Sequence, residues 1–136
     1  MGKQVEFFEK KICDKFGFKY AVSSNSGSSA NLLMISALMS NLYSKRLKKN
    51  DEIIVPALAW STSIFPLTQY GLKPVFVDCD LKTMNIDIDQ VKKAISKKTK
   101  GILTIPIYGN PCEMDELTKI CKKKGFVLLE DTCESM

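Results

Sequence analysis

Apolar and polar residues repeat along this chain with two periods, one typical of helices and one typical of buried strands. Helical spacing relates Val5, Phe8, Ile12 and Phe16, and Gly17 follows as a predicted helix end. Short apolar runs bounded by polar, glycine or proline residues predict strands at 20–24 (YAVSS), 52–56 (EIIVP), 73–78 (KPVFVD), 101–106 (GILTIP) and 126–131 (FVLLED). Further helices are predicted over 31–43, 61–70, 87–95 and 115–124.

Local signals refine the predicted helix ends. Pro66 is expected to kink or interrupt the helix over 61–70, because proline has no N–H to donate. Asp87 or Asp89 is the expected N-cap of the next helix. Gly125 is expected to end the last one, and residues 108–111 (YGNP) are expected to form a turn.

Strand and helix patterns alternate, and the inner strands are continuous apolar runs. This combination predicts an α/β fold, a three-layer and mostly parallel sheet with helices on both faces. Ligands of such sheets bind beyond the carboxyl ends of the strands. The residues to inspect therefore follow the predicted strands: Ser23–Ser29, Ala57–Trp60, Asp78–Asp80, Pro106–Pro111 and Glu130–Glu134.

Composition narrows the class of protein. The chain has 136 residues, enough for one domain with its own core. It contains neither a long apolar run nor a signal-peptide core, so we expect no membrane segment and a cytoplasmic location. The net charge is +5, but the lysine runs fit solvent-exposed faces and last turns of helices and no aromatic residues interleave with them. Nucleic acid is therefore not an expected partner.

Cysteine and histidine usage excludes several chemistries. The five cysteines are odd in number and show no C-x-x-C spacing, so neither a disulfide framework nor a zinc site is indicated. The chain has no histidine, which removes Ser-His-Asp and Cys-His catalysis from these 136 residues.

The stretch SSNSGSSAN, Ser23–Asn31, is rich in small hydroxyl residues at a predicted strand-to-helix junction. Free backbone N–H groups and hydroxyl donors at a helix start form a ready phosphate site. The alternative is a serine-capped helix with no ligand. Neither a P-loop nor a G-x-G-x-x-G motif is present, so the stretch does not indicate a nucleotide.

Three other features carry possible chemistry. Asp131 follows a buried strand and could bind Mg²⁺, orient a base or pair with a cationic ring nitrogen, or it could be an ordinary acidic strand end. Trp60 suits either a ring platform or the core. Asp78 and Asp80 form an Asp-x-Asp pair after a strand, as in metal-dependent phosphotransferases of the haloacid dehalogenase type and in glycosyltransferases, although Thr83 stands one residue late for the former.

Phosphate loop, aromatic platform and terminal carboxylate suit one ligand together, pyridoxal phosphate (PLP). The loop would hold the phosphate and the tryptophan would stack on the ring. The aspartate would keep the pyridine nitrogen protonated, which makes the ring an electron sink.

These residues resemble the DegT/DnrJ/EryC1/StrS family of PLP-dependent nucleotide-sugar aminotransferases. The resemblance runs along the whole chain, through QVEFFEKK, SNSGSSAN, DEIIVPALAWSTS, GLKPVFVDCDLKTMNID, IPIYGNPCEMDEL and GFVLLEDTCESM in that order. It implies part of the large domain of the PLP fold type I, the aspartate aminotransferase-like fold.

The resemblance also implies site residues. Gly27 and Ser28 would bind the cofactor phosphate, and Trp60 would stack on the pyridine ring. Asp131 would pair with the ring nitrogen. Glu134 stands where the aminotransferases usually have glutamine, near the ring hydroxyl, so Asp131 and Glu134 are the expected catalytic residues. No metal ligand is implied, and the Asp-x-Asp pair would be structural.

By the resemblance, residues 1–136 would be a partial PLP-binding large domain. A preceding N-terminal segment, the Schiff-base region and the C-terminal small domain would lie outside it. The complete enzyme would act on a nucleotide-linked keto-deoxysugar for cell-surface polysaccharide or deoxysugar biosynthesis, with an amino donor such as glutamate, as a homodimer. No lysine of this chain matches the context of the family's Schiff-base lysine.

Two reactions and two other classes of protein stay open at this point. The motifs SNSGSSANLL, PALAWSTSIFP, GNPC and EDTCES resemble the sugar 3-dehydratase offshoot of the family, which uses pyridoxamine phosphate (PMP) and has histidine in place of the Schiff-base lysine. Glu134 fits that offshoot. The rivals from other classes are a metal-dependent phosphotransferase that uses Asp78 and Asp80, and an inactive fragment.

Overall fold

The structure is a computed structural model that describes residues 2–135. The chain divides into two compact units, an N-terminal unit up to Ala30 and a C-terminal unit from Asn31 on. Within residues 2–135, every helix is too short or too polar to cross a lipid bilayer.

The N-terminal unit contains helix α1, Lys3–Phe16. It ends as predicted at Gly17, whose backbone is left-handed (φ 72°) and whose N–H donates to the carbonyl of Cys13. The predicted strand over 20–24 is wrong, since these residues form no strand. The physical reason is that a strand is defined by its ladder to a neighbour, and no described segment pairs with this one.

Four parallel strands form the sheet of the C-terminal unit. They are β1 (Glu52–Pro56), β2 (Lys73–Val77), β3 (Thr99–Thr104) and β4 (Val127–Glu130), in the spatial order β2-β1-β3-β4. In the register, Ile54 is paired with Val75 on one side and with Ile102 on the other. The predicted parallel sheet is confirmed, and the strands at its centre are the most completely buried.

Helices fill the connections between the strands. They are α2 (Gly27–Met39), α3 (Ser61–Gln69), α4 (Ile88–Ala94) and α5 (Met114–Lys124), with a 3-10 turn at Ile107–Gly109. Helix α2 begins four residues before its predicted start, because the hydroxyl of Ser26 accepts from the N–H of Ser29 and caps the first turn. Of the two candidate caps for α4, Asp87 fills the role, accepting from the N–H of Gln90 at 2.9 Å.

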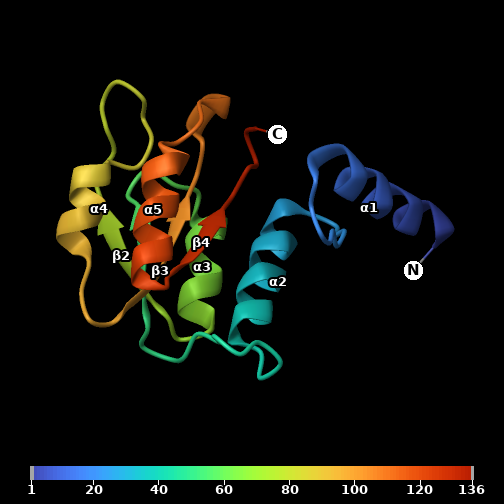
Figure 1. Ribbon diagram of the computed structural model, residues 1–136, viewed down its shortest axis with the longest axis horizontal. Coiled ribbons are helices and arrows are strands. Elements are labelled where there is room, and N and C mark those ends of the chain that lie inside the picture. Colours follow the sequence, from blue (N-terminus) through green and yellow to red (C-terminus); the bar gives the residue numbers. More distant parts are fainter. Residues whose placement is uncertain (1, 136) are drawn as a thin grey trace. The chain divides into compact units, whose positions relative to one another are not determined.

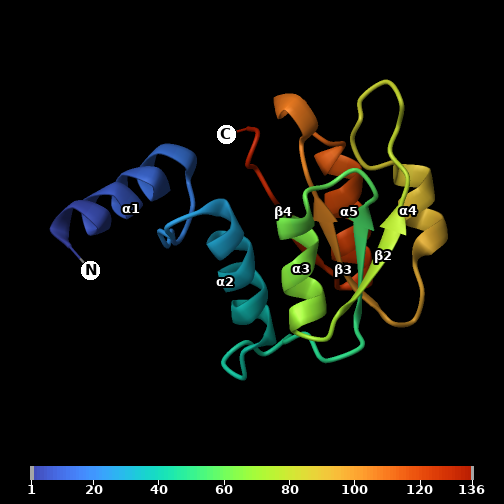
Figure 2. The same ribbon diagram turned by 180° about the vertical axis from the view of Figure 1, so that it is seen from behind.

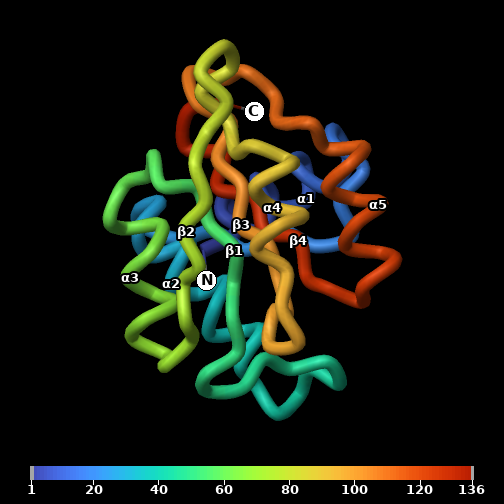
Figure 3. The backbone as a smooth tube through the Cα atoms, turned by 90° about the vertical axis from the view of Figure 1, so that its left-hand side faces the viewer, coloured from blue at the N-terminus to red at the C-terminus, as the bar shows by residue number. Residues whose placement is uncertain are grey.

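The core has two halves, one on each face of the sheet. Ile53, Val55 and Leu103 point to the face that α3 covers together with the part of α2 from Asn31 on. Ile54 and Ile102 point to the opposite face, against α4 and α5. Helices α4 and α5 stand in front of the strands in Figure 1 and α3 stands in front of them in Figure 2, while Figure 3 places α3 and α5 on opposite sides. This is the predicted three-layer arrangement.

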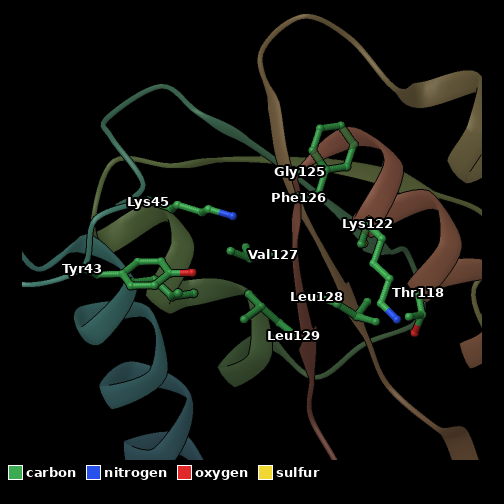
Figure 4. A pocket seen from close by; sticks show the side chains of 11 residues that line it. Tyr43, Lys45, Thr118, Lys122, Gly125, Phe126, Val127, Leu128 and Leu129 are labelled. Carbon is green, nitrogen blue, oxygen red and sulfur yellow. The ribbon is translucent and has the colours of Figure 1, made fainter.

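Strand β4 lies at an edge of the sheet, and a hollow of about 550 Å³ opens beside it. Figure 4 shows Tyr43 and Lys45 across this hollow from Val127 and Leu129. Its lining is mostly apolar and contains no carboxylate. None of the site residues expected from the sequence lines this hollow, so the candidate site is elsewhere.

Candidate active site

The topology itself marks one crevice. The chain runs from β1 to β2 on one side, then returns to place β3 on the other side of β1. In open parallel sheets, ligands bind at such a reversal, beyond the carboxyl ends of the two central strands. The loops after β1 and β3 must flank that crevice.

A cavity of about 410 Å³ lies at this place in the C-terminal unit. The loop after β1 contributes Leu58, Ala59 and Trp60, α3 contributes Ser63, the loop after β3 contributes Ile105, Ile107 and Tyr108, and the segment after β4 contributes Cys133 and Glu134. The cavity is thus apolar on its walls with a few polar groups, and its volume falls within the range of small-molecule and cofactor sites.

Asp131 lies just past the end of β4 and is 8% exposed. Its N–H continues the ladder by donating to the carbonyl of Thr104 at 2.9 Å. Its Oδ2 accepts from Asn31 Nδ2 and from Ser63 Oγ, each at 2.7 Å, and its Oδ1 accepts from the N–H of Cys133 at 3.2 Å. Three donors converge on this carboxylate, so it is a fixed group and more than an acidic strand end.

Trp60 is 71% exposed, so the alternative that placed it in the core is wrong. It precedes α3 as the N-cap residue, and its carbonyl accepts from the N–H of Ser63 at 3.0 Å. The indole therefore stands at the cavity on a backbone that the first turn of α3 holds. An exposed aromatic ring at a cavity edge is an available platform for a flat ligand.

Glu134 also lines the cavity. Its Oε2 accepts from the N–H of Tyr108 at 2.6 Å. Tyr108 and Gly109 both have positive φ (54° and 75°), and a Cβ on Gly109 would lie 3.2 Å from the carbonyl oxygen of Glu134. The carboxylate thus stabilises a sharp turn that the backbone adopts at a cost, and it directs the exposed Tyr108 ring to the cavity edge.

Gly27 and Ser28 form the first turn of α2, in the N-terminal unit. No described residue accepts a hydrogen bond from either N–H group. A Cβ added to Gly27 would meet nothing within 4 Å, so neither packing nor backbone conformation demands glycine at this position. The turn therefore offers donors and open space, as an anion site requires.

The Asp-x-Asp pair, Asp78 and Asp80, accepts hydrogen bonds from backbone N–H groups of its own loop. Oδ1 of Asp80 accepts from the N–H groups of Lys82 and Thr83, and these bonds lower the pKa of the Asp80 carboxyl. Oδ1 of Asp78 accepts from the N–H of Cys79. Among residues 2–135, no three acidic, cysteine or histidine side chains gather as a metal site.

The cavity contains one thiol, that of Cys133. Burial and the negative charges of Asp131 and Glu134 raise its pKa, so the neutral thiol predominates near neutral pH. A neutral thiol is a weak nucleophile. The arrangement therefore favours Cys133 as a small wall residue.

The buried thiol of Cys121 yields a testable pH dependence. Burial against the sheet raises its pKa from 9.0 to about 11. At pH 8, we expect iodoacetamide to alkylate Cys121 about 10²-fold more slowly in the native protein than in urea. Because the unfolded thiol ionises first, this group's contribution to stability is complete below pH 9 and is lost as the pH rises towards about 11.

Mass spectrometry of peptides after timed alkylation measures this ratio, and the exposed Cys133 provides the internal comparison. Equal rates for Cys121 in native and unfolded protein would contradict the expectation.

The structure brings Trp60, Asp131 and Glu134 to one end of the sheet, while Gly27 and Ser28 belong to the N-terminal unit. Sequence reasoning missed Asn31 and Ser63. Both stand inside the quoted motifs SSNSGSSAN and PALAWSTSIFP, but an asparagine in α2 and a serine in the first turn of α3 are ordinary helix residues, so neither was assigned a role.

Comparison with known proteins defines the class of this chain. The model of the DegT/DnrJ/EryC1/StrS aminotransferase family matches residues 1–136. The chain belongs to this family, and the predicted resemblance is confirmed.

Individual relatives narrow the comparison. The chain is 53% identical over 136 residues to a GDP-4-keto-6-deoxy-D-mannose 3-dehydratase of Yersinia pseudotuberculosis, covering 100% of this chain and 34% of that protein. It is 30% identical to a GDP-perosamine synthase of Vibrio cholerae, covering 99% of this chain and 35% of the synthase. The chain therefore spans about a third of the length of these relatives.

A solved structure agrees with the fold. The E. coli GDP-4-keto-6-deoxy-D-mannose-3-dehydratase with bound hydrated PLP superposes with a TM-score of 0.94 at 53% identity, covering 100% of this chain and 35% of that one. The predicted fold class, an α/β fold of PLP fold type I, is confirmed by this likeness.

Proposed function

We propose that the complete protein is a PLP- or PMP-dependent enzyme that acts on a nucleotide-linked keto-deoxysugar. One observation carries the proposal: a fixed carboxylate, Asp131, lies next to a cavity that displays the exposed Trp60 ring, at the sheet reversal where ligands bind. The membership of the chain in the aminotransferase family supports the same conclusion.

The residues present fit the cofactor. Oδ1 of Asp131 has room for one more donor, as a protonated pyridine nitrogen would supply, and Trp60 offers a face for the ring. Gly27 and Ser28 would bind the phosphate through their free N–H groups, and Glu134 would lie near the ring hydroxyl while it holds the Tyr108 turn. When bound, the cofactor supplies an electron sink for bonds at the sugar carbon attached to it.

Of the two reactions of the family, we propose 3-dehydration as the first candidate. The supporting observation is 53% identity to a 3-dehydratase, against 30% to a perosamine synthase. Amino transfer remains the second candidate, supported by the family as a whole. The substrate class is then a nucleotide-linked 4-keto-6-deoxyhexose for cell-surface polysaccharide synthesis, with glutamate as amino donor.

The two reactions differ in where nitrogen goes. Incubation of the complete enzyme with GDP-4-keto-6-deoxymannose, cofactor and glutamate labelled at its amino nitrogen distinguishes them by mass spectrometry of the sugar product. A product that lacks its 3-hydroxyl and carries no label supports 3-dehydration. A labelled amino sugar supports amino transfer, and no conversion with any tested keto-sugar contradicts the proposal.

We further propose that residues 1–136 form part of the PLP-binding large domain and that the complete enzyme is a homodimer. Support comes from the coverage of about a third of the relatives and from the family resemblance. Size-exclusion chromatography with light scattering on the complete protein tests the dimer. The cytoplasmic location stays a prediction from the sequence.

Trp60→Ala is expected to weaken cofactor binding about tenfold, because a stacking partner of the ring is lost. Trp60→Phe keeps a ring and should bind within about threefold of the wild type. Titration of the cofactor-free complete enzyme, followed by the absorbance of the cofactor, measures both. Phe65→Ala removes an exposed aromatic ring of α3 outside the cavity and serves as the control; equal losses at Trp60 and Phe65 would contradict a stacking role.

A further inference from the structure

We propose that Asn31 and Ser63 are positioning residues that reserve one oxygen of Asp131, Oδ1, for the ring nitrogen of the cofactor. The inference rests on the proposed function, because it concerns how the chain presents that carboxylate to a pyridine ring. It adds two residues, one from α2 and one from α3, to which the sequence analysis assigned no role.

The argument begins with the lone pairs of the carboxylate. Each oxygen accepts about two hydrogen bonds. Oδ2 already accepts two, from Asn31 Nδ2 and Ser63 Oγ at 2.7 Å each, so it is fully used. Oδ1 accepts only one, from the N–H of Cys133 at 3.2 Å. A further donor must therefore bind at Oδ1, and the carboxylate cannot exchange the roles of its two oxygens without breaking two short bonds.

Asn31 is locked by a second contact. The residue is 7% exposed, and the same Nδ2 that reaches Asp131 also donates to the carbonyl of Thr62 at 3.4 Å. That carbonyl is free because the residue four positions later is Pro66, which has no N–H. A flipped amide would turn its oxygen towards two acceptors. The proline in α3 thus fixes which end of the Asn31 amide faces Asp131.

Ser63 joins the carboxylate to the ring platform. The residue is 4% exposed. Its hydroxyl donates to Asp131, while its N–H donates to the carbonyl of Trp60 at 3.0 Å. Ser63 therefore connects Asp131, which is expected at the edge of the cofactor ring, with the backbone of Trp60, which is expected at the face of the ring. The first turn of α3 sets the distance between them.

Burial alone does not account for this arrangement. A buried carboxylate is costly to desolvate, and an apolar residue at the end of β4 would avoid that cost. A carboxylate kept only for folding would be satisfied equally well by donors shared between its two oxygens. Here two side chains from different helices converge on a single oxygen and leave the other with an open position.

The test compares two cofactors in the complete, cofactor-free enzyme: PLP and 1-deazapyridoxal phosphate, in which C–H replaces the ring nitrogen. The wild type should bind PLP at least about tenfold more tightly, since a charge-assisted hydrogen bond is lost with the analogue. Ser63→Ala should reduce this preference at least about threefold while the affinity for the analogue stays the same. Ser63→Thr keeps the hydroxyl and should restore the preference.

Asn31→Leu should also reduce the preference for PLP over the analogue. If this variant does not fold, the comparison of Ser63→Ala with Ser63→Thr is sufficient for the test. Thr68→Ala removes a hydroxyl from the far end of α3, where it donates to the carbonyl of Phe65, and should leave the preference unchanged. An unchanged preference in Ser63→Ala, or equal losses of affinity for both cofactors, would overturn the positioning role. A wild type that binds neither PLP nor PMP would overturn the proposed function, and the inference with it.

Discussion

Replacing Asp131 with asparagine is expected to lower the turnover of the complete enzyme on the order of 10²-fold or more. The reason lies in the donors around the side chain. Asn31 and Ser63 would hold the amide oxygen of Asn in the place of Oδ2, which would put the amide NH₂ where Oδ1 now accepts from Cys133. A donor at that place cannot accept from a protonated ring nitrogen, so the cofactor would lose its function as an electron sink.

Steady-state kinetics and the absorption spectrum of the bound cofactor measure this effect together. Glu130→Gln is the matched control, because it neutralises the exposed carboxylate of the preceding residue. It should change turnover less than about twofold. An Asp131→Asn enzyme with the turnover and spectrum of the wild type would show that the carboxylate has no role at the ring.

The strands and helices of the C-terminal unit were predictable because each has a clear period in the sequence. Two examples of local signals are the apolar run Ile53–Val55 and the glycine at position 125. As predicted, the run forms part of strand β1 and Gly125, with a left-handed backbone, ends α5. The segment over 20–24 was predicted as a strand from the same kind of signal and is not one. A strand needs a partner as well as a pattern, and its partner cannot be read from local sequence.

The candidate site also contains some residues that could be predicted from the sequence and others that could not. Asp131 and Trp60 could be nominated because the carboxyl ends of parallel strands are known places for ligands. Asn31 and Ser63 could not, because they bond to Asp131 across 100 and 68 residues of sequence. Their contacts depend on how α2 and α3 pack on the sheet. Pro66 was predicted to kink or interrupt its helix. In the structure α3 continues through Pro66 without interruption, and the carbonyl of Thr62 accepts from Asn31.

Replacing Asn85 with leucine is expected to destabilise the protein by about 2–4 kcal/mol. The residue is 3% exposed, and its side chain bridges two loops at the carboxyl end of the sheet. Its Nδ2 donates to the carbonyls of Asn110 and Pro111 at 2.9 and 3.1 Å, and its Oδ1 accepts from the N–H of Ile107 at 3.0 Å. Leucine has a similar volume but would leave all three backbone groups without their partner.

Asn85→Leu should also perturb the cavity wall, because Ile107, which loses its partner, begins the turn that contains Tyr108. The shift of the thermal midpoint of the cofactor-free complete protein measures the destabilisation. Asn110→Ala is the control, since this exposed side chain makes one bond, from its Nδ2 to the carbonyl of Thr83 at 3.2 Å. It should cost less than about 1 kcal/mol. If both variants shift the midpoint equally, Asn85 does not hold the two loops together. If only Asn85→Leu lowers both the thermal midpoint and the affinity for the cofactor, the single buried amide of Asn85 supports both the fold and the cavity wall.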